Sequence, residues 1–237
     1  MRQSPAREQL RLVKALQIPR GWPYNVDRSL VMKRQVCGLT LLCGLILASS
    51  AANGGEYNEV LSIGDGAPAW KDLPGTDGKK HSLSDYKDRD VVVMVFTSAT
   101  CPTAVDYEDR INELAKRYGG EKGKVAVIAV CVNRVKGDKL DDLTQRAKQR
   151  EFAFDYIYDE SQKIARDYGA IFTPEFYVLN QERKLIYMGA MDDVTDAAKV
   201  KRKFVEEAIA ASLKKEMPEV KETPSRGCRV RYARERR

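Results

Sequence analysis

The stretch VVVMVFTSATCP, residues 91–102, decides the fold. Its first six residues are apolar and mostly β-branched, which is the pattern of a strand buried on both faces. Pro102 suits the first turn of a helix, where its missing N–H would be unpaired anyway. Cys101 is therefore expected where a buried strand passes into a helix. The unpaired N–H groups of a helix N-terminus stabilise a thiolate and lower the pKa of its thiol.

Strand and helix patterns alternate through the rest of the chain. TDGK (76–79) is typical of a hairpin turn. After the helix that begins at Pro102, we expect strands over 124–132, 154–159, 175–180 and 184–189, and helices over 139–151, 161–169 and 195–215. Asp138 and Thr195 are the expected caps of the second and last helices. The alternation predicts one α/β domain over about 57–215, with a central mixed sheet flanked by helices.

The net charge of +7 is unevenly distributed along the chain. Residues 1–34 carry +6 and residues 214–237 carry +5, so the remaining body carries −4. A nucleic-acid-binding domain is expected to have a basic face on its folded part, and this pattern argues against one. The basic ends are interpreted as solvated segments, the C-terminal one being a tail over 216–237 that contains Cys228.

The N-terminal region has the features of an export signal. Residues 32–52 combine a basic start (MKRQ), an apolar run (VCGLTLLCGLILA) and a small-residue segment (SSAA), which is the layout of a cleavable signal peptide. Residues 1–31 would then result from a translation start assigned too far upstream, or they would form an extended N-terminus. The apolar run is short for a bilayer span, although an uncleaved anchor is the alternative. We expect a periplasmic or extracellular protein without a stable membrane span after cleavage.

Three cysteines remain once the signal is removed: Cys101, Cys131 and Cys228. A disulfide persists outside the cytoplasm, and three thiols allow one pair. Cys228 lies in a tail expected to be flexible and able to fold back onto Cys101, where it would resolve an oxidised thiol, form a structural disulfide or stay unpaired. Cys131 ends a buried strand, which favours a packing role and leaves an approach to Cys101 open.

Several motifs together resemble a known family. They are IGDGAPAW (63–70), DGKKHSLSDY (77–86), Cys101-Pro102, TPEFYVLN (173–180), GAMDD (189–193) and RGCRVRY (226–232). In this order they resemble the thioredoxin-fold redoxins of the alkyl hydroperoxide reductase/thiol-specific antioxidant superfamily, in particular an exported peroxiredoxin-like subgroup. The resemblance implies a thioredoxin-like fold in which Pro174 is a cis-proline and the backbone beside Thr173 borders the site, where it pairs with an extended substrate.

The candidate site also departs from the patterns of that superfamily. A thioredoxin pair needs a second thiol where this chain has Ala104. The peroxiredoxin pattern has proline seven residues before the cysteine, where this chain has Met94. It also has Thr or Ser three residues before the cysteine, and Ser98 matches that position. The expected catalytic residues are Cys101 and Cys228. The expected lining residues are Ser98, Thr100, Pro102, Thr173 and Pro174.

These observations lead to three hypotheses. The first is an exported thiol oxidoreductase whose Cys101 attacks a disulfide or a peroxide, with a thiol–disulfide redox protein or a peroxide as its partner. The second is a non-catalytic binding module with a structural Cys101–Cys228 disulfide, and the third is a one-cysteine peroxidase. No cofactor or metal site is expected, because His81 is the only histidine and reads as a surface turn residue, while Asp192-Asp193 reads as an acidic cap at a helix start.

Overall fold

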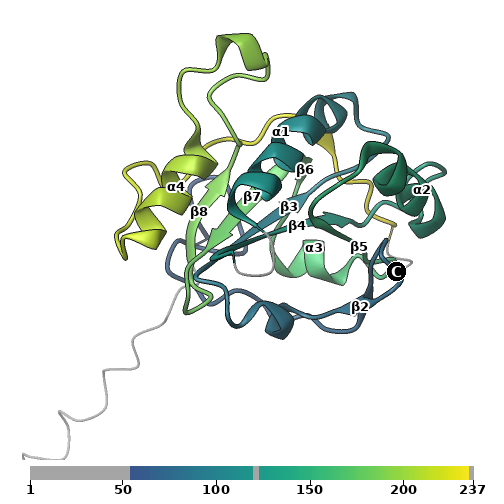
Figure 1. The fold of residues 1–237 in the computed structure, drawn as a ribbon, viewed down its shortest axis with the longest axis horizontal. Helices are drawn as coiled ribbons and strands as arrows, with labels where there is room; N and C mark the ends of the chain where they lie inside the picture. Colours follow the sequence, from purple (N-terminus) through teal and green to yellow (C-terminus); the bar gives the residue numbers. More distant parts are fainter. Residues whose placement is uncertain (1–53, 120–122, 235–237) are drawn as a thin grey trace, which may run out of the picture. The chain divides into compact units, whose positions relative to one another are not determined.

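The computed structural model describes residues 54–119 and 123–234. Its central sheet contains β3 (Val91–Phe96), β4 (Val125–Cys131), β5 (Asp155–Tyr158), β7 (Glu175–Leu179) and β8 (Leu185–Gly189). The strands are ordered β5-β4-β3-β7-β8 (Figure 1). β3, β4 and β5 are parallel, whereas β7 is antiparallel to both β3 and β8. The predicted mixed sheet with its closing hairpin is confirmed.

Helices cover both faces of this sheet. They are α1 (Pro102–Tyr118), α2 (Leu140–Arg150), α3 (Lys163–Asp167) and α4 (Phe204–Leu213), together with the short 3₁₀ turns η1 (Leu83–Tyr86) and η2 (Ala197–Lys199). α1, α2 and α4 contribute to the core on one face. α3 and η1 pack on the other face.

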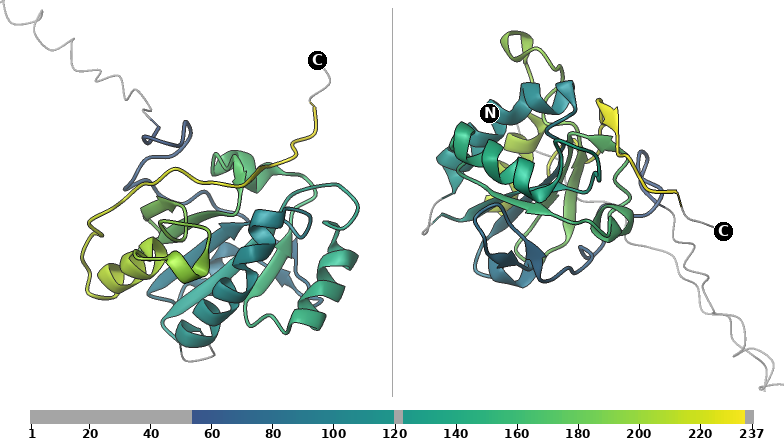
Figure 2. Two further views of the ribbon diagram at one scale, coloured as in Figure 1. Left: turned by 90° about the horizontal axis from the view of Figure 1, so that it is seen from above. Right: turned by 90° about the vertical axis from the view of Figure 1, so that its right-hand side faces the viewer.

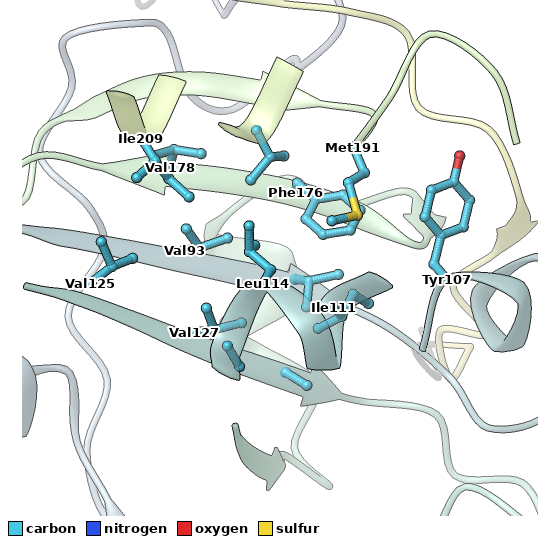
Figure 3. Packing of buried hydrophobic residues seen from close by; sticks show 14 of the residues in the cluster. Val93, Tyr107, Ile111, Leu114, Val125, Val127, Phe176, Val178, Met191 and Ile209 are labelled. Atoms are coloured by element: carbon cyan, nitrogen blue, oxygen red, sulfur yellow. The ribbon is translucent and has the colours of Figure 1, made fainter. Parts of the chain in front are cut away.

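The central strand explains why two cores form. All six residues of β3 are fully buried, as their unbroken apolar sequence predicts. Successive side chains of a strand point to opposite faces. Val93 therefore packs with Val127 of β4 and Leu114 of α1 (Figure 3). Met94 and Phe96 pack in the core on the α3 side.

Residues 73–81 form the predicted hairpin, but His81 differs from its prediction. β1 (Leu73–Pro74) pairs with β2 (Lys80–His81) across the TDGK turn. His81 is buried. Its ring nitrogens lie 2.9 Å from the Asp77 carboxylate and 3.2 Å from the Tyr86 hydroxyl. The Tyr86 hydroxyl also donates to Asp155. The interpretation of His81 as a surface turn residue is therefore wrong, since it ties the hairpin to the sheet edge.

The last helix is shorter than predicted. The pattern over 195–215 favours one long helix capped by Thr195, but α4 begins at Phe204. Arg110 of α1 holds the preceding loop, with guanidinium contacts of 2.5 Å to the Asp192 carboxylate and 2.6 Å to the Thr195 carbonyl. The Asp193 carboxylate accepts the N–H of Lys201. The sequence suggested that Asp192 and Asp193 form an acidic cap at a helix start, but neither residue lies at the start of a helix.

The C-terminal segment packs against the domain along its length. Lys221 and Thr223 exchange backbone hydrogen bonds with Met188 of β8. The chain, yellow in Figure 2, then continues to β9 (Cys228–Arg229), which pairs antiparallel with β6 (Phe172–Thr173). The expectation of a flexible tail is wrong for residues up to 234, and this strand brings Cys228 to the candidate site.

The predicted extension over 1–31 and the predicted signal over 32–52 lie outside the described residues. Within the described part of the chain, no helix is both long and apolar enough to cross a membrane.

The aromatic cluster behind β3 yields a stability prediction. Phe96 is fully buried and meets the Tyr177 ring edge-on at a centroid distance of 5.5 Å. Phe96→Ala should lower the free energy of unfolding by about 3–5 kcal/mol through lost burial and a residual cavity. Val60→Ala is the control, because Val60 is 49% exposed and its truncation should change stability by less than about 0.5 kcal/mol. Urea unfolding curves that coincide for the two variants would contradict the assigned core.

Candidate active site

Cys101 lies at the junction that its sequence predicts. It is the N-cap residue of α1, directly after the loop that leaves β3, and Pro102 is the first helical residue. Its Sγ accepts a hydrogen bond from the N–H of Ala104 at 3.4 Å. Ala104 thus contributes its backbone donor where the thioredoxin pattern would have a second thiol. Cys101 is only 2% exposed, so other parts of the chain cover it.

The Thr173-Pro174 segment faces Cys101 from the other side. The peptide bond between them is cis, as the resemblance implied. The thiol form of Cys101 donates a hydrogen bond to the Thr173 carbonyl, with 3.0 Å between sulfur and oxygen. The buried Glu175 shapes this segment, since its carboxylate accepts the N–H groups of Ile171 and Phe172 at 2.8 and 2.9 Å. Burial raises the pKa of Glu175 despite these hydrogen bonds.

Cys228 is the third element of the site. β9 places it opposite Thr173 in an antiparallel pair, so that its thiol lies close enough to Cys101 to influence the ionisation of that sulfur. Both are free thiols in this structure. Cys101, Thr173, Pro174 and Cys228, which are far apart in the sequence, are therefore adjacent in the fold.

Gly227 allows the tail to come this close. A Cβ at this position would lie 2.0 Å from the carbonyl oxygen of Thr173, well inside van der Waals contact. The backbone before Cys228 can therefore approach Thr173 only without a side chain.

The two thiols have opposite pKa shifts. Burial raises the pKa of Cys101, but hydrogen bonds from the thiol of Cys228, the side chain of Thr173 and backbone N–H groups outweigh it. The pKa of Cys101 is therefore lowered overall. The hydrogen bond with Cys101, followed by burial, raises the pKa of Cys228 to about 11. The first thiolate to form is thus on Cys101, which is the sulfur at the helix N-terminus.

Cys131 does not share this environment. It is fully buried in β4, and its Sγ contacts the Asp138 carbonyl at 3.6 Å. Burial, and then the negative charge of Asp138, raises its pKa well above the usual range of a thiol. Its surroundings support the packing role rather than an exchange with Cys101.

Ser98 and Thr100 are held by Asp138, which the sequence identified only as a helix cap. Both hydroxyls donate to the carboxylate of Asp138, at 2.7 and 2.8 Å, and the N–H of Thr100 donates to it at 3.1 Å. The amide of Asn133 donates to the same carboxylate at 2.9 Å. Asp138 was expected to cap α2, but the N-cap is Lys139. An acidic residue in a turn before a helix predicts an N-cap. The hydroxyl groups that donate to Asp138 lie 38–40 residues earlier in the sequence, so no local pattern reports them.

The pair of thiols yields a prediction about ionisation. Cys228→Ala removes the thiol donor, so the pKa of Cys101 should rise. Cys228→Ser is the matched variant, because its hydroxyl still donates and should keep that pKa low. The ultraviolet absorbance of the thiolate, followed against pH, measures the shift, and Cys101→Ser should lack this titration step. Coincident titrations for the alanine and serine variants would show that Cys228 does not stabilise the thiolate.

The buried carboxylate yields a second prediction from this site. Asp138→Ala leaves several buried donors without a partner and should lower the free energy of unfolding by about 3 kcal/mol. Asp141→Ala is the control, because Asp141 is exposed in the first turn of α2 and should contribute at most about 1 kcal/mol. Equal urea midpoints for the two variants would rule out the structural importance of Asp138.

Known proteins are similar to this chain in both sequence and structure. The thiol-disulfide oxidoreductase ResA of Bacillus thuringiensis is 28% identical over 149 residues, which cover 62% of this chain and 81% of that protein. The putative peroxiredoxin MT2597 of Mycobacterium tuberculosis is 26% identical over 121 residues, covering 49% and 69%. A crystal structure of a hypothetical protein from Sinorhizobium meliloti superposes with a TM-score of 0.68 at 28% identity, covering 74% and 97%.

Two further comparisons show the fold and the family of this chain. A solution structure of a putative thioredoxin from Neisseria meningitidis shares the fold, with a TM-score of 0.51 at 21% identity over 63% of this chain and 92% of that one. The predicted thioredoxin-like fold is therefore confirmed. The AhpC/TSA family matches residues 63–188, from the segment before β1 through most of β8. Because this match covers more than half of the chain, the protein belongs to the AhpC/TSA family.

Proposed function

We propose that this protein is an exported thiol–disulfide oxidoreductase in which Cys101 is the nucleophile and Cys228 is the resolving thiol. The observation that carries the proposal is the β6–β9 pair, which places Cys228 opposite Thr173, the residue whose carbonyl accepts the hydrogen bond of the Cys101 thiol. The opposite pKa shifts of the two thiols agree with it. A static disulfide needs only proximity. A catalytic pair also needs one sulfur that ionises readily, and Cys101 has this property.

The proposed reaction conserves atoms and electrons. The Cys101 thiolate attacks one sulfur of a substrate disulfide, and the other substrate sulfur leaves as a thiolate with the bonding electron pair. The Cys228 sulfur, after losing its proton, then attacks Sγ of Cys101 and releases the second substrate thiolate. The substrate disulfide is reduced to two thiols while the two protein thiols are oxidised to one disulfide. A dithiol-bearing redox protein would reduce that disulfide for the next turnover.

Catalysis in this scheme depends on groups that are already in position. The N–H of Ala104 and the thiol of Cys228 stabilise the attacking thiolate. The contacts of Ser98 and Thr100 with Asp138 hold the loop that presents it. The Thr173 carbonyl would be a backbone acceptor beside the reacting sulfurs.

Peroxide is the second candidate substrate, because one relative is named as a putative peroxiredoxin. The Cys101 thiolate would attack one peroxide oxygen and become a sulfenic acid, while the other oxygen leaves as water or an alcohol. Condensation with the Cys228 thiol would release water and form the same disulfide. Met94, in place of the proline of the peroxiredoxin pattern, argues for disulfides as the main substrate.

Export is part of the proposal because it determines the redox environment. The signal-like segment over 32–52 supports it. A periplasmic or extracellular location would keep a Cys101–Cys228 disulfide oxidised until a dedicated partner reduces it.

A chromogenic aromatic disulfide tests the proposed pair by stoichiometry. The assay uses a chain in which Cys37 and Cys43 of the predicted signal are replaced by serine, because these thiols would also react. This chain, the reference for the variants, should release two aromatic thiols and end with a Cys101–Cys228 disulfide. Cys228→Ser should release one and retain the other as an adduct, and Cys101→Ser should react only at the background rate. Cys131→Ala is the control and should behave as the reference chain. Intact mass spectrometry identifies the products.

Two other outcomes would reject the proposal. A Cys101–Cys228 disulfide that a mild reductant opens only after denaturation would show a structural bridge. Peroxide consumption that requires Cys101 and is unchanged in Cys228→Ser, without exchange with the aromatic disulfide, would show a one-cysteine peroxidase.

A further inference from the structure

Residues 227–233 form an extended C-terminal segment that passes Cys101, with Cys228 beside its thiol. Beyond the β6–β9 pair, the N–H of Val230 donates to the Ile171 carbonyl at 2.8 Å. The N–H of Arg231 donates to the side-chain oxygen of Asn133 at 2.9 Å. Gln162 contacts the segment twice, donating to the Arg231 carbonyl at 3.0 Å and accepting the N–H of Ala233 at 2.7 Å. The segment is therefore held mainly through its backbone.

Two buried amides make these contacts, and both are fixed from behind. Asn133 is 3% exposed and Gln162 is 1% exposed. The Asn133 amide nitrogen is held by the Asp138 carboxylate, and the Gln162 amide nitrogen also donates to the Val132 carbonyl. The side-chain oxygens of these two amides accept the N–H groups of Arg231 and Ala233 in the extended segment. Such fixed groups bind any extended backbone in this register and would be left unpaired without one, which is unfavourable for buried polar groups.

The segment lies on a surface formed by Asn133, Gln162 and residues 170–173, which we call the groove. Side chains of the segment alternate between this groove and solvent. Cys228 faces Cys101, whereas Arg229 and Arg231 are exposed. Val230 is 7% exposed and packs into the core on the α3 side. The Tyr232 hydroxyl donates to the Ala170 carbonyl at 2.6 Å. This arrangement places an aliphatic position two residues after the cysteine and an aromatic position four residues after it.

We propose that this groove is a binding site for an extended, disulfide-bonded polypeptide with the pattern Gly-Cys-x-aliphatic-x-aromatic, and that residues 227–233 are its resident occupant. This inference rests on the proposed function and specifies its substrate class. The substrate strand would displace the segment and pair with Thr173, so that its cysteine sulfur reaches Cys101. Gly227 sets the glycine position because the Thr173 carbonyl excludes a Cβ there.

The chemistry at the groove is the exchange already described. Cys101 would form a mixed disulfide with the cysteine of the bound strand, and the sulfur formerly bonded to that cysteine would leave as a thiolate. Cys228, on the displaced but still tethered segment, would then attack Cys101 and release the strand as a thiol. Its return to the groove would bring it into attacking position.

Two peptides of the same composition and charge test the inference. The matched peptide is Ser-Arg-Gly-Cys-Arg-Val-Arg-Tyr, and the shifted peptide is Ser-Arg-Gly-Cys-Val-Arg-Tyr-Arg. Each has its cysteine activated as a disulfide with a chromogenic aromatic thiol. The protein is the full chain with Cys37→Ser, Cys43→Ser and Cys228→Ser, so that the mixed disulfide with Cys101 accumulates and no thiol of the predicted signal competes. The matched peptide should react at least about tenfold faster, because the shifted one places arginines in the apolar positions. Both peptides should react at equal rates with free cysteine.

Variants of the resident segment provide the second arm. Adding Tyr232→Ala to the Cys228→Ser chain weakens the occupant and should raise the rate with the matched peptide several-fold. Exposed Arg231→Ala is the control, because Arg231 contacts the groove through its backbone N–H and carbonyl, and it should leave the rate within about twofold. A rate unchanged by Tyr232→Ala would overturn the claim that the segment occupies the substrate groove.

The outcomes separate this inference from the proposed function. Equal rates for the two peptides, with normal exchange between Cys101 and the small aromatic disulfide, would overturn the inference alone. Failure of Cys101 to react with any disulfide would reject the proposed function. In that case, binding of fluorescent versions of both peptides with serine in place of cysteine, followed by anisotropy on the Tyr232→Ala chain, decides the inference. Preference for the matched peptide supports the groove, and equal binding overturns it.

Discussion

The site depends on a carboxylate that has no contact with water. Asp138 is completely buried, and transferring an ion from water to the protein interior is unfavourable by several kcal/mol unless hydrogen bonds replace its solvation. Those bonds come from the loop before Cys101 and from Asn133. Satisfying the charge therefore fixes the loop that presents Cys101. Through Asn133, it also fixes an oxygen that holds the C-terminal segment.

This arrangement links two parts of the chain that would otherwise be independent. Cys101 belongs to a strand–helix junction near the middle of the sequence, and Cys228 belongs to its last ten residues. Backbone pairing with Thr173, the close approach at Gly227 and the two buried amides hold them together. The chain thus supplies its second thiol from a separate strand, whereas the thioredoxin pattern would place it at Ala104.

The sequence predicted the sheet well because the buried strands have strong local signals. The unbroken apolar run of β3 and the Pro102 helix start are visible without any tertiary information. The predicted start of the last helix at residue 195 was wrong, because Arg110 holds the loop before α4 and sequence periodicity does not report that contact. His81 was misplaced for the same reason, since its partners are Asp77 and Tyr86, and Tyr86 in turn donates to Asp155 of β5. Asp138, Asn133, Gln162 and Glu175 were missed because each acts on a segment distant in sequence or on backbone groups, for which residue patterns give no signal.

The raised pKa of Cys228 has a consequence for the order of events. Its largest cause is the hydrogen bond with Cys101, and the charge of the Cys101 thiolate adds to it. In the proposed exchange, Cys101 joined to a substrate sulfur would carry no charge, and these two causes would disappear. The pKa of Cys228 would then fall toward that of an ordinary thiol, so its nucleophilic form would become available only after the first bond has formed. On this mechanism, the formation of the mixed disulfide would itself activate the second sulfur.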